Sequence, residues 1–254
     1  MKICGLIGKN IQYSLSPKIH NQYYKDNNIN LNYKLFDMEE EELIHFLKNI
    51  DKKNYVGFNV TIPYKQSIIE YLDEVTYPAS LIGAVNTISI EGERLVGYNT
   101  DYFGFIESLK CYDIRVQDKS VLILGNGGAA KAVYYALKDL GVRNIDVAGR
   151  NVAKIDKDFL LAGNILNLKS IKSLFKYDMI INCTPLGNIN NQVLPINLKN
   201  FSEDLVIYDL NYSPKKTNIL IEAEKLGLKT INGESMLEHQ AYKSIDIWCS
   251  NLKR

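Results

Sequence analysis

The sequence has 254 residues, with 30 basic and 29 acidic side chains, so its formal net charge at pH 7 is only +1. This balance argues against a nucleic-acid-binding protein, which usually carries a basic excess. Charged residues make up 23% of the chain and hydrophobic residues 46%, so it can form a core and is not a disordered protein. Apolar runs stay shorter than the roughly 18 residues of a membrane-spanning helix, and residues Met1–Gly8 lack a signal-peptide pattern. We therefore expect a cytoplasmic protein that does not bind membranes.

Alternating apolar runs and helix-period segments in the first hundred residues predict an α/β domain. The expected strands are Lys2–Ile7, Asn32–Phe36, Tyr55–Asn59, Ala84–Ile90 and Arg94–Tyr98. The expected helices are Pro17–Asp26 and Met38–Asn49. Ser16 is a candidate cap for the first helix, because proline follows it at the first helical position.

A second block of βα units follows the polar stretch Cys111–Lys119 and predicts a Rossmann-like domain. Its expected strands are Ser120–Leu124, Asn144–Ala148, Met179–Asn182 and Leu205–Asp209. Its expected helices are Ala129–Leu140 and Asn218–Lys225, the second of which ends before Gly227. A final amphipathic helix is expected over Glu234–Asn251.

A glycine-rich loop between the first strand and the first helix of this block predicts a dinucleotide site. The sequence Gly125-Asn126-Gly127-Gly128-Ala129-Ala130 fits the pattern G-x-G-x-x-G/A. Gly125 permits the tight turn, Gly127 lets the backbone approach a pyrophosphate, and Ala130 allows close helix packing. The N-H groups at the start of the helix would bind the anion.

The end of the next strand predicts NADP rather than NAD. An NAD enzyme usually has an acidic residue there for the ribose 2′-hydroxyl, whereas this chain has Arg150 followed by Asn151. A guanidinium suits a 2′-phosphate, and Lys154 would add a second positive charge. Asp146 is the nearby acid, but it falls in mid-strand, too early to reach the ribose.

Several polar motifs outside the glycine loop have no common structural explanation. They are Ser14-Leu15-Ser16-Pro17, Asn59-Val60-Thr61-Ile62-Pro63-Tyr64-Lys65, Gly83-Ala84-Val85-Asn86-Thr87, Gly97-Tyr98-Asn99-Thr100-Asp101 and Met236-Leu237-Glu238-His239-Gln240-Ala241. With the glycine loop, Asn182-Cys183-Thr184-Pro185-Leu186-Gly187 and Asp209-Leu210-Asn211-Tyr212-Ser213-Pro214, they resemble the shikimate dehydrogenase family in order and over nearly the whole chain. The resemblance implies reversible NADPH-linked reduction of 3-dehydroshikimate to shikimate, a step in aromatic amino-acid biosynthesis, without a metal ion.

The resemblance also implies roles for individual residues. Lys65 and Asp101 would be the catalytic pair. Shikimate would contact Ser14, Ser16, Asn59, Thr61, Asn86, Tyr212 and Gln240. NADP would contact Gly125, Asn126, Gly127, Gly128, Ala129, Ala130, Arg150, Asn151, Lys154, Thr184, Gly233 and Met236. The residue types in the shikimate set suit a polyhydroxylated acid. Their hydroxyl groups can donate to its carboxylate, and their amide groups can both donate to and accept from its ring hydroxyls. Each residue by itself could equally be structural.

The resemblance predicts a substrate domain over residues 1–101, an NADP-binding domain over 102–236, and a last helix, 237–254, that returns to the substrate domain. We expect the active site in the cleft between the domains, in a monomer or a homodimer.

The chain departs from the family at Asn10 and Tyr13, where a proline and a histidine are usual, and at Gly149 and Asn151, where an asparagine and a threonine flank the arginine. A quinate/shikimate dehydrogenase that uses NAD is one alternative, against which Arg150 argues. A non-catalytic NADP-binding homologue is another, against which the presence of both Lys65 and Asp101 argues.

Overall fold

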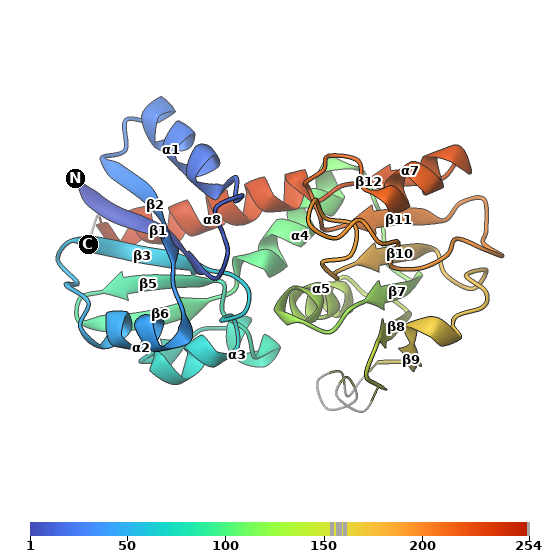
Figure 1. Cartoon of the computed structure of the whole chain (residues 1–254), viewed down its shortest axis with the longest axis horizontal. Helices are drawn as coiled ribbons and strands as arrows, with labels where there is room; N and C mark the ends of the chain where they lie inside the picture. The colour runs from blue at the N-terminus through green and yellow to red at the C-terminus, as the bar shows by residue number, and fades with distance from the viewer. Residues whose placement is uncertain (153–154, 156–158, 160–161, 253–254) are drawn as a thin grey trace. The chain divides into compact units, whose positions relative to one another are not determined.

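The computed structural model describes residues 1–152, 155, 159 and 162–252, and its chain forms two compact units. Unit 1 comprises Met1–Gly104 and Leu237–Arg254, and unit 2 comprises Phe105–Met236. The chain thus enters unit 1 at both ends, and the two parts of unit 1 are coloured blue to green and red in Figure 1.

Unit 1 is built on a six-stranded sheet with the order β2-β1-β3-β5-β6-β4. Its strands are β1 (Lys2–Gly8), β2 (Leu31–Asp37), β3 (Tyr55–Val60), β4 (Glu74–Val75), β5 (Thr87–Glu91) and β6 (Arg94–Tyr98). β5 is antiparallel to both of its neighbours, while β1 is parallel to β2 and β3, and β4 is parallel to β6. The other five strands therefore run in one direction.

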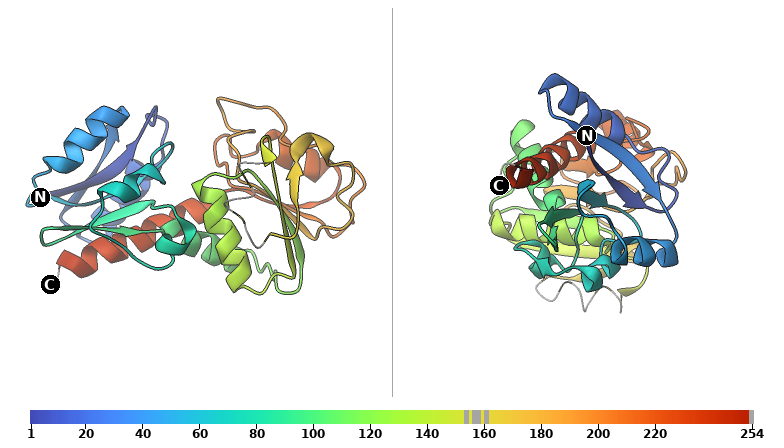
Figure 2. Two further views of the ribbon diagram at one scale, coloured as in Figure 1. Left: turned by 90° about the horizontal axis from the view of Figure 1, so that it is seen from below. Right: turned by 90° about the vertical axis from the view of Figure 1, so that its left-hand side faces the viewer.

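Helices cover both faces of this sheet because its strands are apolar on both sides. On one face, α1 (Ser16–Asp26) and α8 (Glu234–Leu252) contribute Tyr24 and Trp248 to a core with Leu6 of β1. Figure 2 shows α8 lying along the sheet of this unit. On the other face, α2 (Glu40–Lys48), the 3-10 helix η1 (Ser67–Tyr71) and α3 (Ala79–Ile82) pack over Ile7 and Phe58.

Unit 2 is built on a parallel six-stranded sheet with the order β12-β11-β10-β7-β8-β9. Its strands are β7 (Ser120–Leu124), β8 (Asn144–Gly149), β9 (Ile165–Asn167), β10 (Met179–Asn182), β11 (Val206–Asp209) and β12 (Lys229–Ile231). The chain winds outward from β7 through β8 to β9 and then returns to β10 on the other side of β7. Ligands of such sheets bind at the carboxyl ends of the strands where the winding reverses, which here is between β7 and β10.

Helices also cover the sheet of unit 2. α7 (Asn218–Lys225) packs on one face, against Ile180 and Ile207. On the opposite face, Phe105 of α4 (Thr100–Cys111) stacks on Tyr208 of β11, and α5 (Gly128–Asp139) lies along β7. A short 3-10 helix, η2 (Leu168–Ser170), follows β9.

The α/β class predicted from the sequence is confirmed, and most predicted elements lie close to their predicted bounds. One prediction about a helix end is wrong: Ser16 is the first residue of α1, and no side chain caps that helix. α3, α4 and the short strands β4, β9 and β12 are elements that the sequence pattern did not reveal.

Candidate active site

The polar motifs of unit 1 meet at one edge of its sheet. β1, β3 and β6 run in the same direction and end at Gly8, Val60 and Tyr98, while antiparallel β5 begins at Thr87. Asn59 pairs with Thr87, and Thr87 with Tyr98, so these ends are in register. The segments that carry Ser14, Lys65, Asn86 and Asp101 all leave the sheet at this edge.

Lys65 and Asp101 form an ion pair there. The Lys65 Nζ lies 2.5 Å from Asp101 Oδ2, and their side chains are only 15% and 9% exposed. The amide of Asn86 donates to the other carboxylate oxygen, Oδ1, over 2.8 Å. Gln240 of α8 joins the group, since its Oε1 lies 3.4 Å from the Asn86 amide nitrogen. The fold therefore brings together four predicted site residues from segments far apart in the sequence.

The two serines of the first motif lie at the amino end of α1. Ser14 Oγ donates to Ser16 Oγ over 3.2 Å, and the backbone N-H of Ser16 donates to Ser14 Oγ. Ser16 is buried and Ser14 is half-buried. Thr61, directly after β3, is also half-buried, and its backbone N-H donates to the carbonyl of Ile7. The paired hydroxyls form a compact polar group in the loop that follows β1.

Asn59 lies inside unit 1, at 4% exposure. Its Oδ1 accepts from the hydroxyl of Tyr33, and its amide nitrogen lies 2.9 Å from the hydroxyls of both Thr87 and Ser244. Both amide hydrogens thus have internal acceptors, which favours a supporting role beneath the surface of the edge.

The structure explains how the loop after β1 accommodates Asn10. Asn10 has φ 56°, which asparagine tolerates and proline cannot adopt. Its backbone N-H also donates to Asp37 Oδ1 over 2.8 Å, a bond that proline cannot make. The loop is therefore held in a way that excludes the proline usual in the family. Tyr13, the other departure, is 54% exposed.

In unit 2, the glycine-rich loop lies between β7 and α5. Gly125 has φ 107°, and a side chain there would press on Thr184 and on the backbone of Cys183, so the turn itself requires glycine. Gly127 differs, because it has φ −80° as the residue before α5, and a Cβ there would meet nothing within 4 Å. The fold does not demand glycine at this exposed position. Ala130 is fully buried, as close helix packing requires.

The loop after β10 faces the glycine turn and is held by a buried polar cluster. Thr184 donates to Asn182 Oδ1 over 2.7 Å, and the Asn182 amide donates to Asp209 Oδ1 over 2.9 Å. Burial raises the pKa of Asp209, although the side chains of Thr217, Asn211 and Asn182 donate to it and oppose that rise. This cluster fixes the loop beside the turn at Gly125.

The other predicted cofactor residues of unit 2 lie after β8 and β12. Arg150 follows β8 directly and is exposed, as is Asn151. Gly149 leaves space that the side chain of Ile155 occupies. Lys154 lies outside the described residues.

Gly233 and Met236 stand at the start of α8, and Tyr212 is half-buried in the segment after β11. A Cβ at Gly233 would overlap the carbonyl oxygen of Leu210, so close backbone approach alone accounts for this glycine. Met236 is buried. Tyr212 belongs to unit 2, whereas the other predicted substrate residues belong to unit 1.

Sequence reasoning missed three buried hydroxyl residues beneath Asn86. Thr87, Thr100 and Ser244 are each fully buried and lie within 3.1 Å of one another through their Oγ atoms. Thr87 and Thr100 stand next to Asn86 and Asp101 in the motifs already singled out. Ser244 follows Gln240 by one helical turn, so the spacing on α8 was a signal that could have found it.

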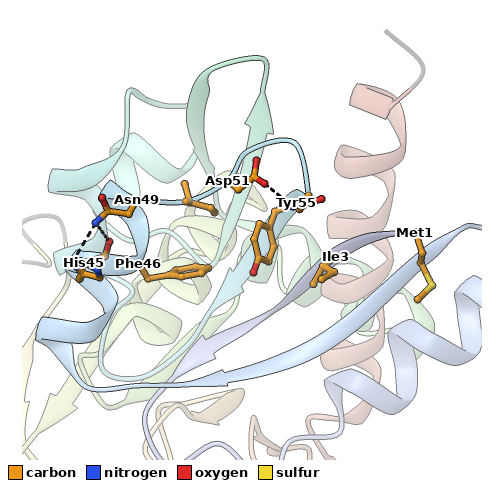
Figure 3. A pocket seen from close by; sticks show the side chains of 9 residues that line it. Met1, Ile3, His45, Phe46, Asn49, Asp51 and Tyr55 are labelled. Carbon is orange, nitrogen blue, oxygen red and sulfur yellow. Dashed lines mark hydrogen bonds between the residues drawn. The ribbon is translucent and has the colours of Figure 1, made fainter.

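A separate hollow of about 440 Å³ lies at the opposite edge of the sheet of unit 1 (Figure 3). It is lined by residues at the starts of β1 and β3, near the end of α2 and in the segment between α2 and β3, among them Met1, Phe46, Asp51 and Tyr55. Asp51 is engaged by the amide of Asn54 and by the backbone N-H of Lys53. Ligand sites of such sheets lie at the carboxyl ends, so this hollow is not the candidate site.

Two further observations concern the part of the chain that the structure describes. None of its helices has both the length and the apolarity needed to cross a membrane. It also contains no group of three or more histidine, cysteine, aspartate or glutamate side chains arranged to hold a metal ion.

Comparison with known proteins identifies the family. Residues 6–88 match the family described as shikimate dehydrogenase substrate binding domain. A Clostridium botulinum protein named shikimate dehydrogenase (NADP(+)) is 50% identical over 252 residues, which is 99% of this chain and 98% of the relative. The chain belongs to the shikimate dehydrogenase family.

Solved structures of the family have the same fold. Shikimate dehydrogenase 1 from Peptoclostridium difficile matches with a TM-score of 0.89 and 38% identity, over 98% of this chain and 92% of that one. Shikimate 5-dehydrogenase from Thermus thermophilus, solved with NADP(H) and shikimate, matches with a TM-score of 0.89 and 31% identity, over 98% and 94%. The family resemblance inferred from the motifs is therefore confirmed.

Proposed function

We propose that this chain catalyses the reversible NADPH-linked reduction of 3-dehydroshikimate to shikimate. Relatives at 50% identity over nearly the whole chain are named NADP-dependent shikimate dehydrogenases. The predicted enzyme class, activity and cofactor are confirmed by these relatives, and the NAD-dependent quinate/shikimate alternative is not favoured. A non-catalytic homologue is not favoured either.

The observation that carries the residue assignment is the largely buried ion pair of Lys65 and Asp101. Reduction of a ketone by hydride builds negative charge on its oxygen, which a positioned acid must neutralise. The Lys65 ammonium carries a proton to donate, and Asp101 holds that ammonium in place over 2.5 Å. In the direction of shikimate oxidation, the same pair accepts the proton of the hydroxyl. We assign proton transfer to the pair.

We assign substrate contacts by the chemistry of the side chains around this pair. Ser14, Ser16 and Thr61 offer hydroxyl donors to the carboxylate, and the family resemblance adds the hydroxyl of Tyr212. Asn86, Asp101 and Gln240 offer donors and acceptors to the ring hydroxyls. We place Asn59 beneath the substrate, because its amide is already bonded to the protein.

The described residues of unit 2 fit NADP. The empty space over Gly127 and the start of α5 suit a pyrophosphate, which would receive backbone N-H groups there. Arg150 and Asn151 would contact the 2′-phosphate, and Thr184, Gly233 and Met236 would lie around the rest of the cofactor. When bound, NADPH supplies the hydride. Residues 1–101 with the last helix would then hold substrate, and residues 102–236 would hold the cofactor.

The deciding experiment is an absorbance assay of the reduced nicotinamide that crosses shikimate and quinate with NADP and NAD. The proposal expects the highest kcat/KM with shikimate and NADP. Faster turnover of quinate with NAD would instead support the alternative, and absence of turnover in all four combinations would support a binding protein.

We further propose that the enzyme works in the cytoplasm, in aromatic amino-acid biosynthesis, as a monomer or a homodimer. Sedimentation of the purified protein distinguishes the two assembly states.

A further inference from the structure

A cluster of three hydroxyls lies directly beneath the amide of Asn86. Thr87 begins β5, Thr100 begins α4, and Ser244 lies in α8, so three separate elements meet at this point. The Thr87 and Ser244 hydroxyl oxygens are 2.9 Å apart, and Thr100 is 3.1 Å from each of them. All three residues are fully buried, so water does not compete for their hydrogen bonds.

The backbone beside this cluster determines which way the Asn86 amide points. The backbone N-H of Thr100 donates to Asn86 Oδ1 over 2.6 Å, and the hydroxyl of Thr87 lies 3.1 Å from the same oxygen. Because a backbone N-H can only donate, the atom facing it must be the amide oxygen. The NH₂ group therefore faces Asp101, as its carboxylate requires.

Ser244 supplies the acceptor that completes this arrangement. Its hydroxyl donates to the carbonyl of Gln240 over 3.0 Å, which uses its single proton. Its lone pairs then face the amide of Asn59 and the hydroxyls of Thr87 and Thr100. When one of Thr87 and Thr100 donates its hydroxyl proton to Ser244, the hydroxyl of the other threonine can donate to Asn86 Oδ1. Ser244 thus gives the cluster a shared acceptor and connects α8 to it.

We propose that Ser244 is a positioning residue that acts on the Lys65–Asp101 pair through Asn86. The inference rests on the proposed catalytic role of that pair. Without the Ser244 hydroxyl, the two threonines and Asn59 lose a shared acceptor, and the threonine hydroxyls beside Asn86 Oδ1 move, which displaces the Asn86 amide relative to Asp101. A small misplacement of a catalytic group lowers the rate of the chemical step more than it weakens substrate binding.

The first test compares Ser244→Ala with Ser108→Ala. Ser108 is also a fully buried helical serine, which donates to the carbonyl of Phe105 and bonds to the hydroxyl of Tyr208, but it lies in unit 2 outside this cluster. Both variants should lower Tm. Ser244→Ala alone should lower kcat for shikimate oxidation, by about tenfold, with a smaller change in KM. Wild-type kcat in Ser244→Ala well below its Tm would overturn the inference.

A double-mutant cycle with Asn86→Ala tests the route of the effect. If Ser244 acts through Asn86, adding Ser244→Ala to Asn86→Ala should change kcat by less than about twofold. A full additional tenfold loss would contradict the inference. Thr87→Val, which removes the hydroxyl and keeps the shape, should also lower kcat. If Ser244→Ala does not fold, this variant is the test, and wild-type kcat in it would contradict the inference. Wild-type protein that fails to oxidise shikimate would contradict the proposed function itself, which separates the two failures.

Discussion

Lys65 belongs to a motif that the sequence shows, but its 2.5 Å contact with Asp101 is visible only in the structure. A lysine after a strand end is ordinarily a solvated side chain; the family motif singles out Lys65, and the structure adds its contact with Asp101. We expect Lys65→Ala to lower kcat by about 10² to 10⁴, the usual range for a positioned acid, with little change in KM. Steady-state kinetics with shikimate and NADP measure both values.

The matched control for this variant is Lys176→Ala. Lys176 pairs with Asp146 over 2.6 Å, and that carboxylate is fully buried in unit 2. Both substitutions leave a buried carboxylate without its cation and should lower Tm, but Lys176→Ala should keep wild-type kcat. Equal loss of activity in the two variants would show that Lys65 matters only for folding.

His20 is a second residue whose surroundings no sequence pattern revealed. It is fully buried, stacks on Tyr33 with ring centroids 3.9 Å apart, and contacts the hydroxyl of Tyr24 through Nδ1. Its Nε2 has no hydrogen-bond partner among the described residues. Burial therefore lowers the pKa of His20 from 6.5 to about 3.

This shift predicts how stability depends on pH. Between pH 6.5 and about 3, the unfolded chain binds a proton at His20 and the folded chain does not. The contribution of His20 to the free energy of unfolding should thus be complete above pH 6.5. It should fall by up to about 1.4 kcal/mol per pH unit as the pH drops below that value. His20→Phe, which keeps the stacking, should lose this slope. Urea unfolding at pH values from about 7.5 down to about 5 measures it, and parallel slopes for both proteins would refute the assignment.

At the scale of elements, apolar runs located β1, β3, β7, β8 and β10 well, because strands buried on both faces are rich in apolar residues. α4 was missed because its aromatic segment Tyr102–Phe105 favours a strand by composition, and because the helix begins only one residue after β6. Short strands such as β9 and β12 take their structure from neighbours in the sheet, which a local pattern cannot reveal. Likewise, the motifs suggested Asn86 and Gln240, but their contact depends on α8 packing against unit 1.

The glycine loop shows the difference between a glycine that the fold needs and one that a ligand needs. Gly127→Ala should leave Tm unchanged, since φ −80° suits alanine and the space is open. It should raise KM for NADP about tenfold or more, because an added methyl holds the pyrophosphate away from at least one N-H donor. Kinetics at varied NADP, together with a thermal melt, measure both effects.

Gly125→Ala is the counterpart of this variant. With φ 107° and the backbone of Cys183 beside it, alanine at this position should destabilise unit 2 by about 1 kcal/mol or more. If Gly127→Ala lowered Tm as much as Gly125→Ala and left KM for NADP unchanged, the loop would be only a structural turn.

At the scale of the whole molecule, the positive and negative charges nearly cancel. Any salt dependence of cofactor binding must therefore come from charged side chains close to the cofactor. With 30 basic and 29 acidic residues, the net charge exerts little attraction on an anionic cofactor. Discrimination between NADP and NAD then depends on cationic side chains near the 2′-phosphate. Among the residues that the structure describes, Arg150, directly after β8, is the candidate for this role.

We therefore expect wild type to prefer NADP over NAD by at least about tenfold in kcat/KM, which corresponds to about 1.4 kcal/mol. Raising the salt concentration should weaken use of NADP more than use of NAD, because the guanidinium–phosphate attraction at an exposed site is screened. Arg150→Ala should remove most of the preference and most of this difference in salt dependence, while NAD use stays nearly unchanged. Equal damage to both cofactors would mean that Arg150 only supports the loop. A preference that survived the substitution would assign discrimination to other groups around the 2′-phosphate.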